Sequence, residues 1–194
     1  MDFKLKIVFF IFLISLSNNS FSQNIFDVSL ENIFIGDSLL KHFSNKEITN
    51  AQLFQYPKSQ KFVKKSFNLT NSKYSKIAFH YKNNDTNYTI YSISTAKFFG
   101  KDNIDICKSF MKKIVNDYVL KFETNSKEYE SPYNIDDGKS IAYVNDIKIE
   151  SGKIRMFCVD WSDLTEKKRG WSDNFQLNIS SDVFTKWLNN EAYY

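Results

Sequence analysis

A long amphipathic helix is the feature that most constrains the fold of this 194-residue chain. Apolar side chains recur at three- and four-residue steps across residues 102–124, and the stripe consists of Ile104, Cys107, Phe110, Met111, Ile114, Tyr118 and Phe122. A stripe of this spacing predicts a helix with one buried face. Strand-like patterns lie on both sides of the helix in the sequence, so we expect the helix to cover a sheet.

Three strand-like segments precede this helix and three follow it. Their apolar and polar residues alternate, or they form short apolar runs bounded by turn residues, at 61–69, 76–82, 88–93, 139–150, 153–161 and 172–180. Alternation with a period of two is typical of strands with one buried face. The polar turn 83–87 predicts a hairpin between the second and third segments. Residues 123–138 are acidic and lack a period, which predicts an irregular connection.

Short helices are predicted near both ends of the folded region. Asp37 or Ser38 is placed to cap one, Ser44 forms a capping box with Glu47, and Ser181 or Asp182 caps the last. The expected fold class is therefore α+β. It has a largely antiparallel sheet with helices packed on one side, in the order α-βββ-α-βββ-α.

The N-terminus is typical of a secretory signal peptide over residues 1–22. Lys4 and Lys6 precede an apolar run, 7–16, that is too short to span a bilayer, and small residues precede Gln23. We expect cleavage before Gln23, which leaves 23–194 as a single α+β domain with no stable membrane span. The expected location is the bacterial periplasm or the medium. The alternative is an uncleaved N-terminal anchor.

The chain has two cysteines, Cys107 and Cys158. Cysteines of exported proteins usually pair in the oxidising environment that they reach. Cys107 lies on the apolar stripe of the long helix, and Cys158 lies beside Met156 on the strand face that this helix should cover. A disulfide that joins helix to sheet is therefore predicted. Two separate buried thiols, or a redox or metal pair, are the alternatives.

The segment Gly36-Asp37-Ser38-Leu39 resembles the nucleophile block of the GDSL (SGNH) lipases and esterases. That resemblance implies a serine esterase with Ser38 as the nucleophile. A serine hydroxyl needs a positioned base, however, and the family's histidine follows an aspartate by three residues. Neither His42 nor His80 has this spacing. We therefore interpret Ser38 as a helix cap and keep the esterase as the alternative function.

Other classes of function leave little trace in the sequence. The formal net charge is +4, and loss of the signal removes one negative and two positive charges, which leaves +3 spread along the chain. This small excess gives no indication of a nucleic-acid partner. No cofactor motif or metal-ligand cluster is found. His80 fits a half-buried strand histidine better than a metal ligand or a base.

The leading hypothesis is a non-enzymatic binding or envelope-associated module. Its candidate surface is the segment between residues 160 and 172, predicted as a polar loop with a basic tip. Two tryptophans flank three cations there: Trp161, Lys167, Lys168, Arg169 and Trp171. Such a surface suits a carbohydrate, an anionic envelope component or a lipid headgroup.

A second resemblance extends over most of the chain. Three features carry it, besides the signal peptide: Gly36-Asp37-Ser38-Leu39-Leu40, Cys107 on the long helix and Cys158-Val159-Asp160-Trp161-Ser162. Together they resemble a group of small exported bacterial proteins without an assigned function. The resemblance implies export and transfers neither an activity nor site residues.

Overall fold

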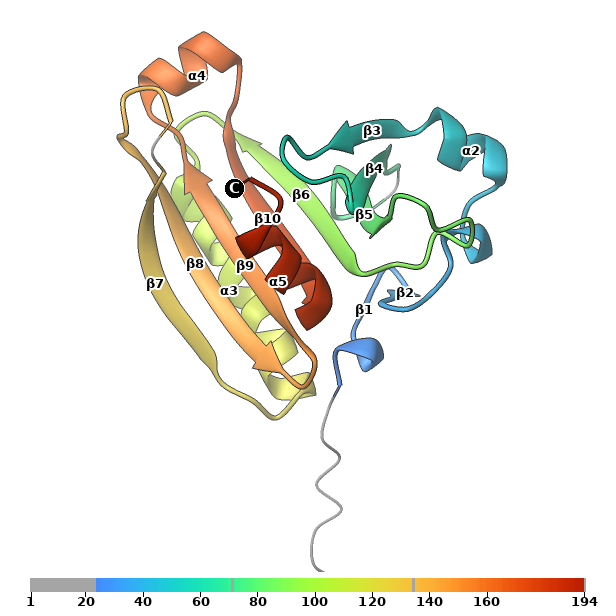
Figure 1. Cartoon of the computed structure of the whole chain (residues 1–194). Helices are drawn as coiled ribbons and strands as arrows, with labels where there is room; N and C mark the ends of the chain where they lie inside the picture. Colours follow the sequence, from blue (N-terminus) through green and yellow to red (C-terminus); the bar gives the residue numbers. More distant parts are fainter. Residues whose placement is uncertain (1–23, 71, 134, 194) are drawn as a thin grey trace, which may run out of the picture.

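The computed structural model describes residues 24–70, 72–133 and 135–193, and its centre is one eight-stranded antiparallel sheet (Figure 1). The strand order is β3-β4-β5-β6-β10-β9-β8-β7. The strands are β3 (Gln52–Gln55), β4 (Phe62–Asn68), β5 (Lys76–Lys82), β6 (Ser92–Gly100), β7 (Ser126–Tyr133), β8 (Ser140–Ile149), β9 (Gly152–Asp160) and β10 (Asp173–Ser181). Two meanders, β3–β6 and β7–β9, are therefore joined by β10, which lies between β6 and β9.

The remaining elements are short, except for the central helix. They are η1 (Ile25–Asp27), β1 (Ser29–Leu30), β2 (Ile33–Phe34), η2 (Leu39–Lys41), α2 (Asn45–Asn50), α3 (Ile104–Lys121), α4 (Asp163–Arg169) and α5 (Asp182–Asn190). The expected α+β class and the antiparallel sheet are confirmed. The predicted signal peptide, 1–22, lies outside the described residues.

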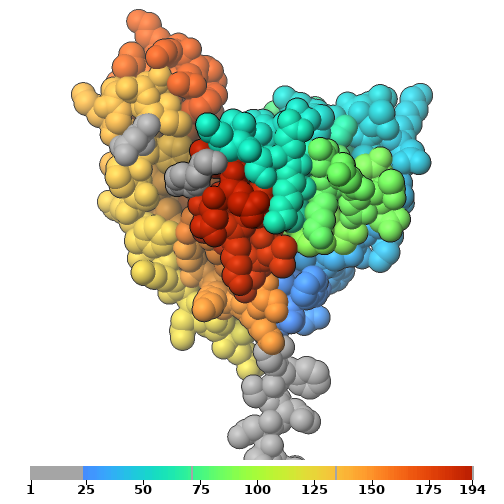
Figure 2. Space-filling model, in the orientation of Figure 1, coloured from blue at the N-terminus to red at the C-terminus, as the bar shows by residue number. Residues whose placement is uncertain are grey.

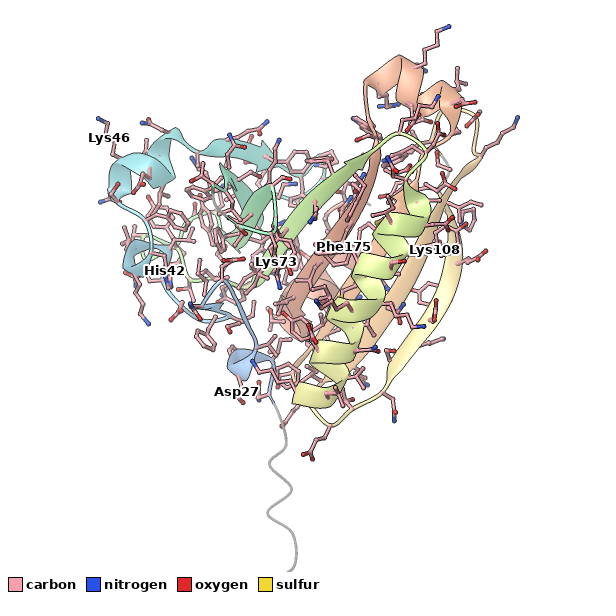
Figure 3. The ribbon with its side chains drawn as sticks, turned by 180° about the vertical axis from the view of Figure 1, so that it is seen from behind. Asp27, His42, Lys46, Lys73, Lys108 and Phe175 are labelled. Carbon is pink, nitrogen blue, oxygen red and sulfur yellow. A yellow bond between two sulfur atoms is a disulfide. The ribbon has the colours of Figure 1, made fainter. Side chains whose placement is uncertain are left out.

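Helix α3 covers one face of the sheet, as its stripe predicts. It packs mainly on β9 and β10, and its buried side chains join those of Phe175, Leu177 and Ile179 in one core. Figure 3 shows this side of the molecule, with α3 laid over the strand that carries Phe175. The predicted disulfide is confirmed: Cys107 of α3 and Cys158 of β9 are bonded, and their Cα atoms are 5.9 Å apart.

The prediction that all helices pack on one side of the sheet is wrong. Helix α5 lies on the face opposite α3 (Figures 1 and 3). Its Phe184 and Trp187 form a second core with Phe62 of β4 and with Tyr56. Phe62 and Val63 are adjacent in β4, so their side chains point to opposite faces of the sheet. Both are buried, and β4 therefore has an apolar side chain to cover on each face. The second face therefore needs its own cover.

The predicted order α-βββ-α-βββ-α is also incomplete, because the two edge strands were missed. All four residues of β3 are exposed, and β7 occupies the segment predicted to be irregular. An edge strand is held by backbone pairing on one side and needs no apolar pattern. The third predicted strand is displaced as well: β6 begins at Ser92 and not at Tyr88, and it runs on to Gly100.

Candidate functional site

Ser38 caps the short helix η2 and has no histidine partner. Its Oγ accepts a hydrogen bond from the Leu40 N–H at 3.2 Å and donates one to the Asn87 carbonyl. The imidazole of His42 instead lies 3.1 Å from the Asp37 carboxylate. Among the residues that the structure describes, Ser38 has no hydrogen bond to an imidazole. The geometry supports the interpretation as a cap and leaves the hydroxyl without a base.

The segment predicted as a polar loop with a basic tip is the helix α4. Ser162 caps it by accepting a hydrogen bond from the Thr165 N–H, acidic residues occupy its first turn, and Lys167, Lys168 and Arg169 occupy its last. Gly170 ends the helix with φ at 66°, a left-handed conformation that glycine adopts without strain. The loop prediction is therefore wrong. It followed the polarity of the segment and overlooked these capping signals.

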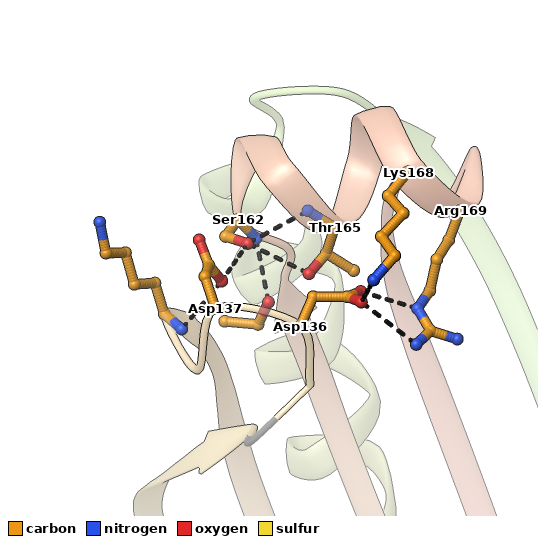
Figure 4. A network of polar contacts seen from close by, with 8 residues as sticks. Asp136, Asp137, Ser162, Thr165, Lys168 and Arg169 are labelled. Carbon is orange, nitrogen blue, oxygen red and sulfur yellow. Dashed lines mark hydrogen bonds and ion pairs between the residues drawn. The ribbon is translucent and has the colours of Figure 1, made fainter.

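Two of the three predicted cations are bound within the protein (Figure 4). Lys168 Nζ and Arg169 Nε lie 2.8 Å and 2.7 Å from the carboxylate oxygens of Asp136, whose side chain is buried. Arg169 and then Lys168 hold the pKa of Asp136 well below its usual value. Asp137 accepts a hydrogen bond from the Ser162 hydroxyl at 2.7 Å. These contacts tie α4 to the β7–β8 connection, whereas Lys167 is exposed and has no ion-pair partner among the described residues.

The two predicted tryptophans do come together. Their ring centroids are 4.7 Å apart, and Trp161 also packs on Tyr133. Trp161 is buried, whereas Trp171 is 40% exposed. The guanidinium of Arg169 lies 5.1 Å from the centroid of the Trp171 ring. Trp171 is thus held between two neighbours and presents part of its surface to solvent.

A larger site, which the sequence did not reveal, lies on the sheet face opposite α3. Strand register aligns Ala78 of β5, Ser94 of β6 and Asn178 of β10 in one row, and Ala96 lies beside Gln176 in the next. Paired residues of neighbouring strands point to the same face. Because alanine and serine side chains are short, the middle of this face is a depression floored by small and polar groups.

This depression forms a cavity of about 480 Å³ under α5, which contributes Phe184, Thr185 and Leu188 to its wall. Two adjoining cavities, of about 370 Å³ and 540 Å³, share Tyr133 with it and extend toward β8 and toward Trp171. We call the three together the sheet-face groove. On this side of the molecule, Figure 2 shows α5, in red, between the β7–β9 half and the β3–β6 half. Each volume falls in the range of ligand sites.

The charge of the groove is one-sided. Its 480 Å³ cavity is lined by Lys64, Lys76, Lys153 and Arg155, and by no carboxylate among the described residues. The guanidinium of Arg155 donates two hydrogen bonds, each 2.7 Å long, to the carboxylate of Asp146, which neutralises its charge. The three lysines have no ion-pair partner in the described part of the chain. Burial lowers the pKa of Lys64 and is also the main cause of the lowered pKa of Lys153.

His80 lies in the floor beside Lys64 and is buried, not half-buried as predicted. Its Nε2 shares a hydrogen bond of 2.9 Å with the Tyr56 hydroxyl, and its ring packs on Phe184. Burial, followed by the positive charge of Lys64, lowers the pKa of His80 to about 3, and the Ser92 backbone opposes this shift only in part. No group of potential metal ligands occurs among the described residues. His80 is therefore neutral at pH 7 and packs in the floor of the groove.

The neutral state of His80 predicts a loss of stability in mild acid. Between pH 6.5, its pKa when unfolded, and about pH 3, the unfolded chain binds a proton that the folded protein does not. The free energy of unfolding should therefore fall as the pH is lowered through 6.5. Urea unfolding at about pH 7.5 and about pH 5 measures this loss, which His80→Gln should reduce. His42→Gln is the control, and an equal loss in wild type and His80→Gln would refute the assignment.

Comparisons with known proteins add no identity to this geometry. No family model, curated protein or solved structure matches the chain. None of the helices in residues 24–70, 72–133 and 135–193 is both long and apolar enough to cross a membrane.

The groove was missed because its floor resembles a solvent-facing strand surface. The alternation in β10 turns Asn174, Gln176 and Asn178 away from the α3 core, a pattern that is typical of side chains that face water. A usable signal was present in the neighbouring strand, where Ser92, Ser94 and Ala96 also alternate with core residues. Short side chains on adjacent central strands indicate a depression more than a solvated face.

Proposed function

We propose that this chain is a non-enzymatic binding protein, exported from the cell, that holds its ligand in the sheet-face groove. One observation carries the proposal: a cavity of about 480 Å³ is floored by polar side chains on the central strands of a rigid sheet. Concave sites with a few fixed polar groups are the usual places for ligands. The disulfide is compatible with export.

Several polar groups of the groove are free to bind. The side chains of Ser66, Ser94 and Asn178 make no hydrogen bonds within the described residues, although all three are half-buried. The Trp171 region joins the same groove through the cavity of about 540 Å³. Part of the surface expected from the sequence, between residues 160 and 172, thus forms one end of the proposed site. Trp161 and Trp171 line this end, and the basic tip does not.

A single substitution tests the location of the site. Asn178→Trp places a large side chain in the floor of the cavity, and Asn116→Trp makes the same change on the exposed side of α3. The exported chain, expected to begin at Gln23, is immobilised and exposed to an envelope extract. The retained glycans, peptides and lipids are identified by mass spectrometry. Thermal melting of both variants confirms that they fold.

We expect wild type and Asn116→Trp to retain the same ligand and Asn178→Trp to lose it. Equal retention by all three proteins would show that the groove is not the site. Retention of no glycan, peptide or lipid by folded wild type would reject the binding function itself.

A further inference from the structure

We propose that the ligand of the sheet-face groove is an acidic oligosaccharide, an inference that rests on the binding function proposed above. Its acidic groups would pair with Lys64 and Lys153, and one of its sugar rings would stack on Trp171. Three independent features of the groove lead to this class of ligand: its hydrogen-bonding groups, its exposed aromatic rings and its unpaired cations.

The hydrogen-bonding groups suit a ligand rich in hydroxyls. Amides such as those of Gln176 and Asn178 both donate and accept, and so do the hydroxyls of Ser66 and Ser94. A sugar hydroxyl has the same double capacity, so it can bond to any of these groups in either direction. A row across four strands carries three such groups, Ser66, Ser94 and Asn178, with Ala78 between the two serines, and it offers repeated contacts to a repeating polymer.

The aromatic end of the groove suits a flat ring with C–H groups on its face. Trp171 is 40% exposed and Phe98 is 49% exposed, and both line the cavity of about 540 Å³. Arg169 lies against the Trp171 ring, and Arg169 is itself bound by Asp136. Trp171 is thus oriented before any ligand binds. A preorganised aromatic face loses little conformational freedom on binding.

The two lysines without an ion-pair partner in the described part of the chain indicate that the ligand carries acidic groups. Lys64 and Lys153 lie at opposite ends of one cross-strand row. In this row Lys64 pairs with His80, His80 with Ser92, Ser92 with Ser180, and Ser180 with Lys153. Both lysines are half-buried and lack a carboxylate partner in the described part of the chain. Lys64 has a cation–π contact, with its Nζ 4.7 Å from the centroid of the Phe54 ring, but this contact does not neutralise its charge. A partly buried ammonium group without a carboxylate partner is unfavourable. A carboxylate, sulfate or phosphate on the ligand would supply the missing charge.

An extended peptide fits the groove less well. Peptides that bind to sheets usually pair their backbone with an exposed strand edge. The floor of the groove consists of β4, β5, β6, β10 and β9, each of which is paired on both sides. From Asn174 to Ser180 the floor extends about 20 Å along β10, the length of a short oligomer. Side-chain contacts along such a floor favour a polymer that is recognised by its hydroxyls.

A glycan array tests the inference with matched ligands and matched variants. It carries oligosaccharides of uronate, sulfated and phosphorylated sugars, each beside its neutral counterpart. The protein variants are Lys64→Gln with Lys153→Gln, and Lys112→Gln with Lys113→Gln as the control of equal charge on the exposed side of α3. Trp171→Ala is the third variant. Affinities of the best ligand and its neutral form are then measured by calorimetry at low and high salt.

We expect at least one acidic oligosaccharide to bind about tenfold or more tightly than its neutral form, since a hydrogen bond to a charged group is worth at least this factor. The Lys64/Lys153 variant should remove that difference, and high salt should reduce it. The Lys112/Lys113 control should retain it. Trp171→Ala should weaken the acidic and the neutral forms alike.

Three results would overturn the inference: equal binding of acidic and neutral forms, no effect of the Lys64/Lys153 variant, or no binding of any oligosaccharide. The proposed function is tested separately by Asn178→Trp. If that variant still prevents retention of a peptide or a lipid from the extract, the groove remains a binding site and only the ligand class is wrong.

Discussion

The double variant Cys107→Ala, Cys158→Ala is expected to be about 4 kcal/mol less stable than the oxidised protein. The disulfide joins residues that are 51 apart in sequence, so it removes many conformations from the unfolded chain. Both cysteines are fully buried in the core between α3 and the sheet. Alanine leaves only a small void there, so most of the loss should come from the unfolded state.

Urea unfolding monitored by circular dichroism measures this difference. Wild type reduced with a thiol and kept reduced is the matched control, because it loses the bond without a change of side chain. Reduced wild type and the double variant should unfold at similar urea concentrations, both well below oxidised wild type. A difference of less than about 1 kcal/mol between the oxidised protein and the variant would contradict the expectation.

Trp187→Ala should destabilise the protein by about 3–5 kcal/mol. Trp187 is 1% exposed, and its ring packs against Tyr56 and Phe62 with centroid distances of 4.8 Å and 5.0 Å. Its Nε1 also donates a hydrogen bond to the Ser59 hydroxyl. The substitution leaves a cavity in the small core that holds α5 on the sheet. Because α5 forms a wall of the sheet-face groove, ligand retention should fall together with stability.

The control for this variant is Val183→Ala on the same helix, where the side chain is 54% exposed and should cost little. Chemical unfolding is followed by far-ultraviolet circular dichroism, since the variant changes the tryptophan fluorescence. A loss near that of Val183→Ala would mean that α5 is held by contacts other than Trp187.

Local patterns in the sequence were sufficient where a short stretch determines the structure. The stripe of α3, the alternation of β10 and the caps Ser38, Ser44 and Ser181 are all confirmed. The disulfide could be predicted because one cysteine lies on the helical stripe and the other on the strand face that this stripe covers.

Features that depend on distant neighbours could not be predicted in this way. The edge strands β3 and β7 are held by backbone pairing, which leaves no apolar period to read. Two cations of α4, Lys168 and Arg169, are bound by Asp136, about thirty residues earlier in the chain. The groove is hollow because α5 and the β7–β8 hairpin rise beside small side chains. Helix α5 follows β10 directly, but the other floor strands β4, β5 and β6 are distant from α5 in sequence.

The position of β10 between β6 and β9 has a consequence for how the chain reaches its fold. Neither meander borders the other, so the hydrogen-bond ladder across the middle of the sheet requires residues 173–181. A polypeptide that emerges from a ribosome or a membrane pore begins with its N-terminal end. In such a chain, β6 and β9 emerge before β10, so each of these strands has one unpaired edge until β10 arrives. The sheet would then be completed in a late step, because these distant pairings have to wait for β10.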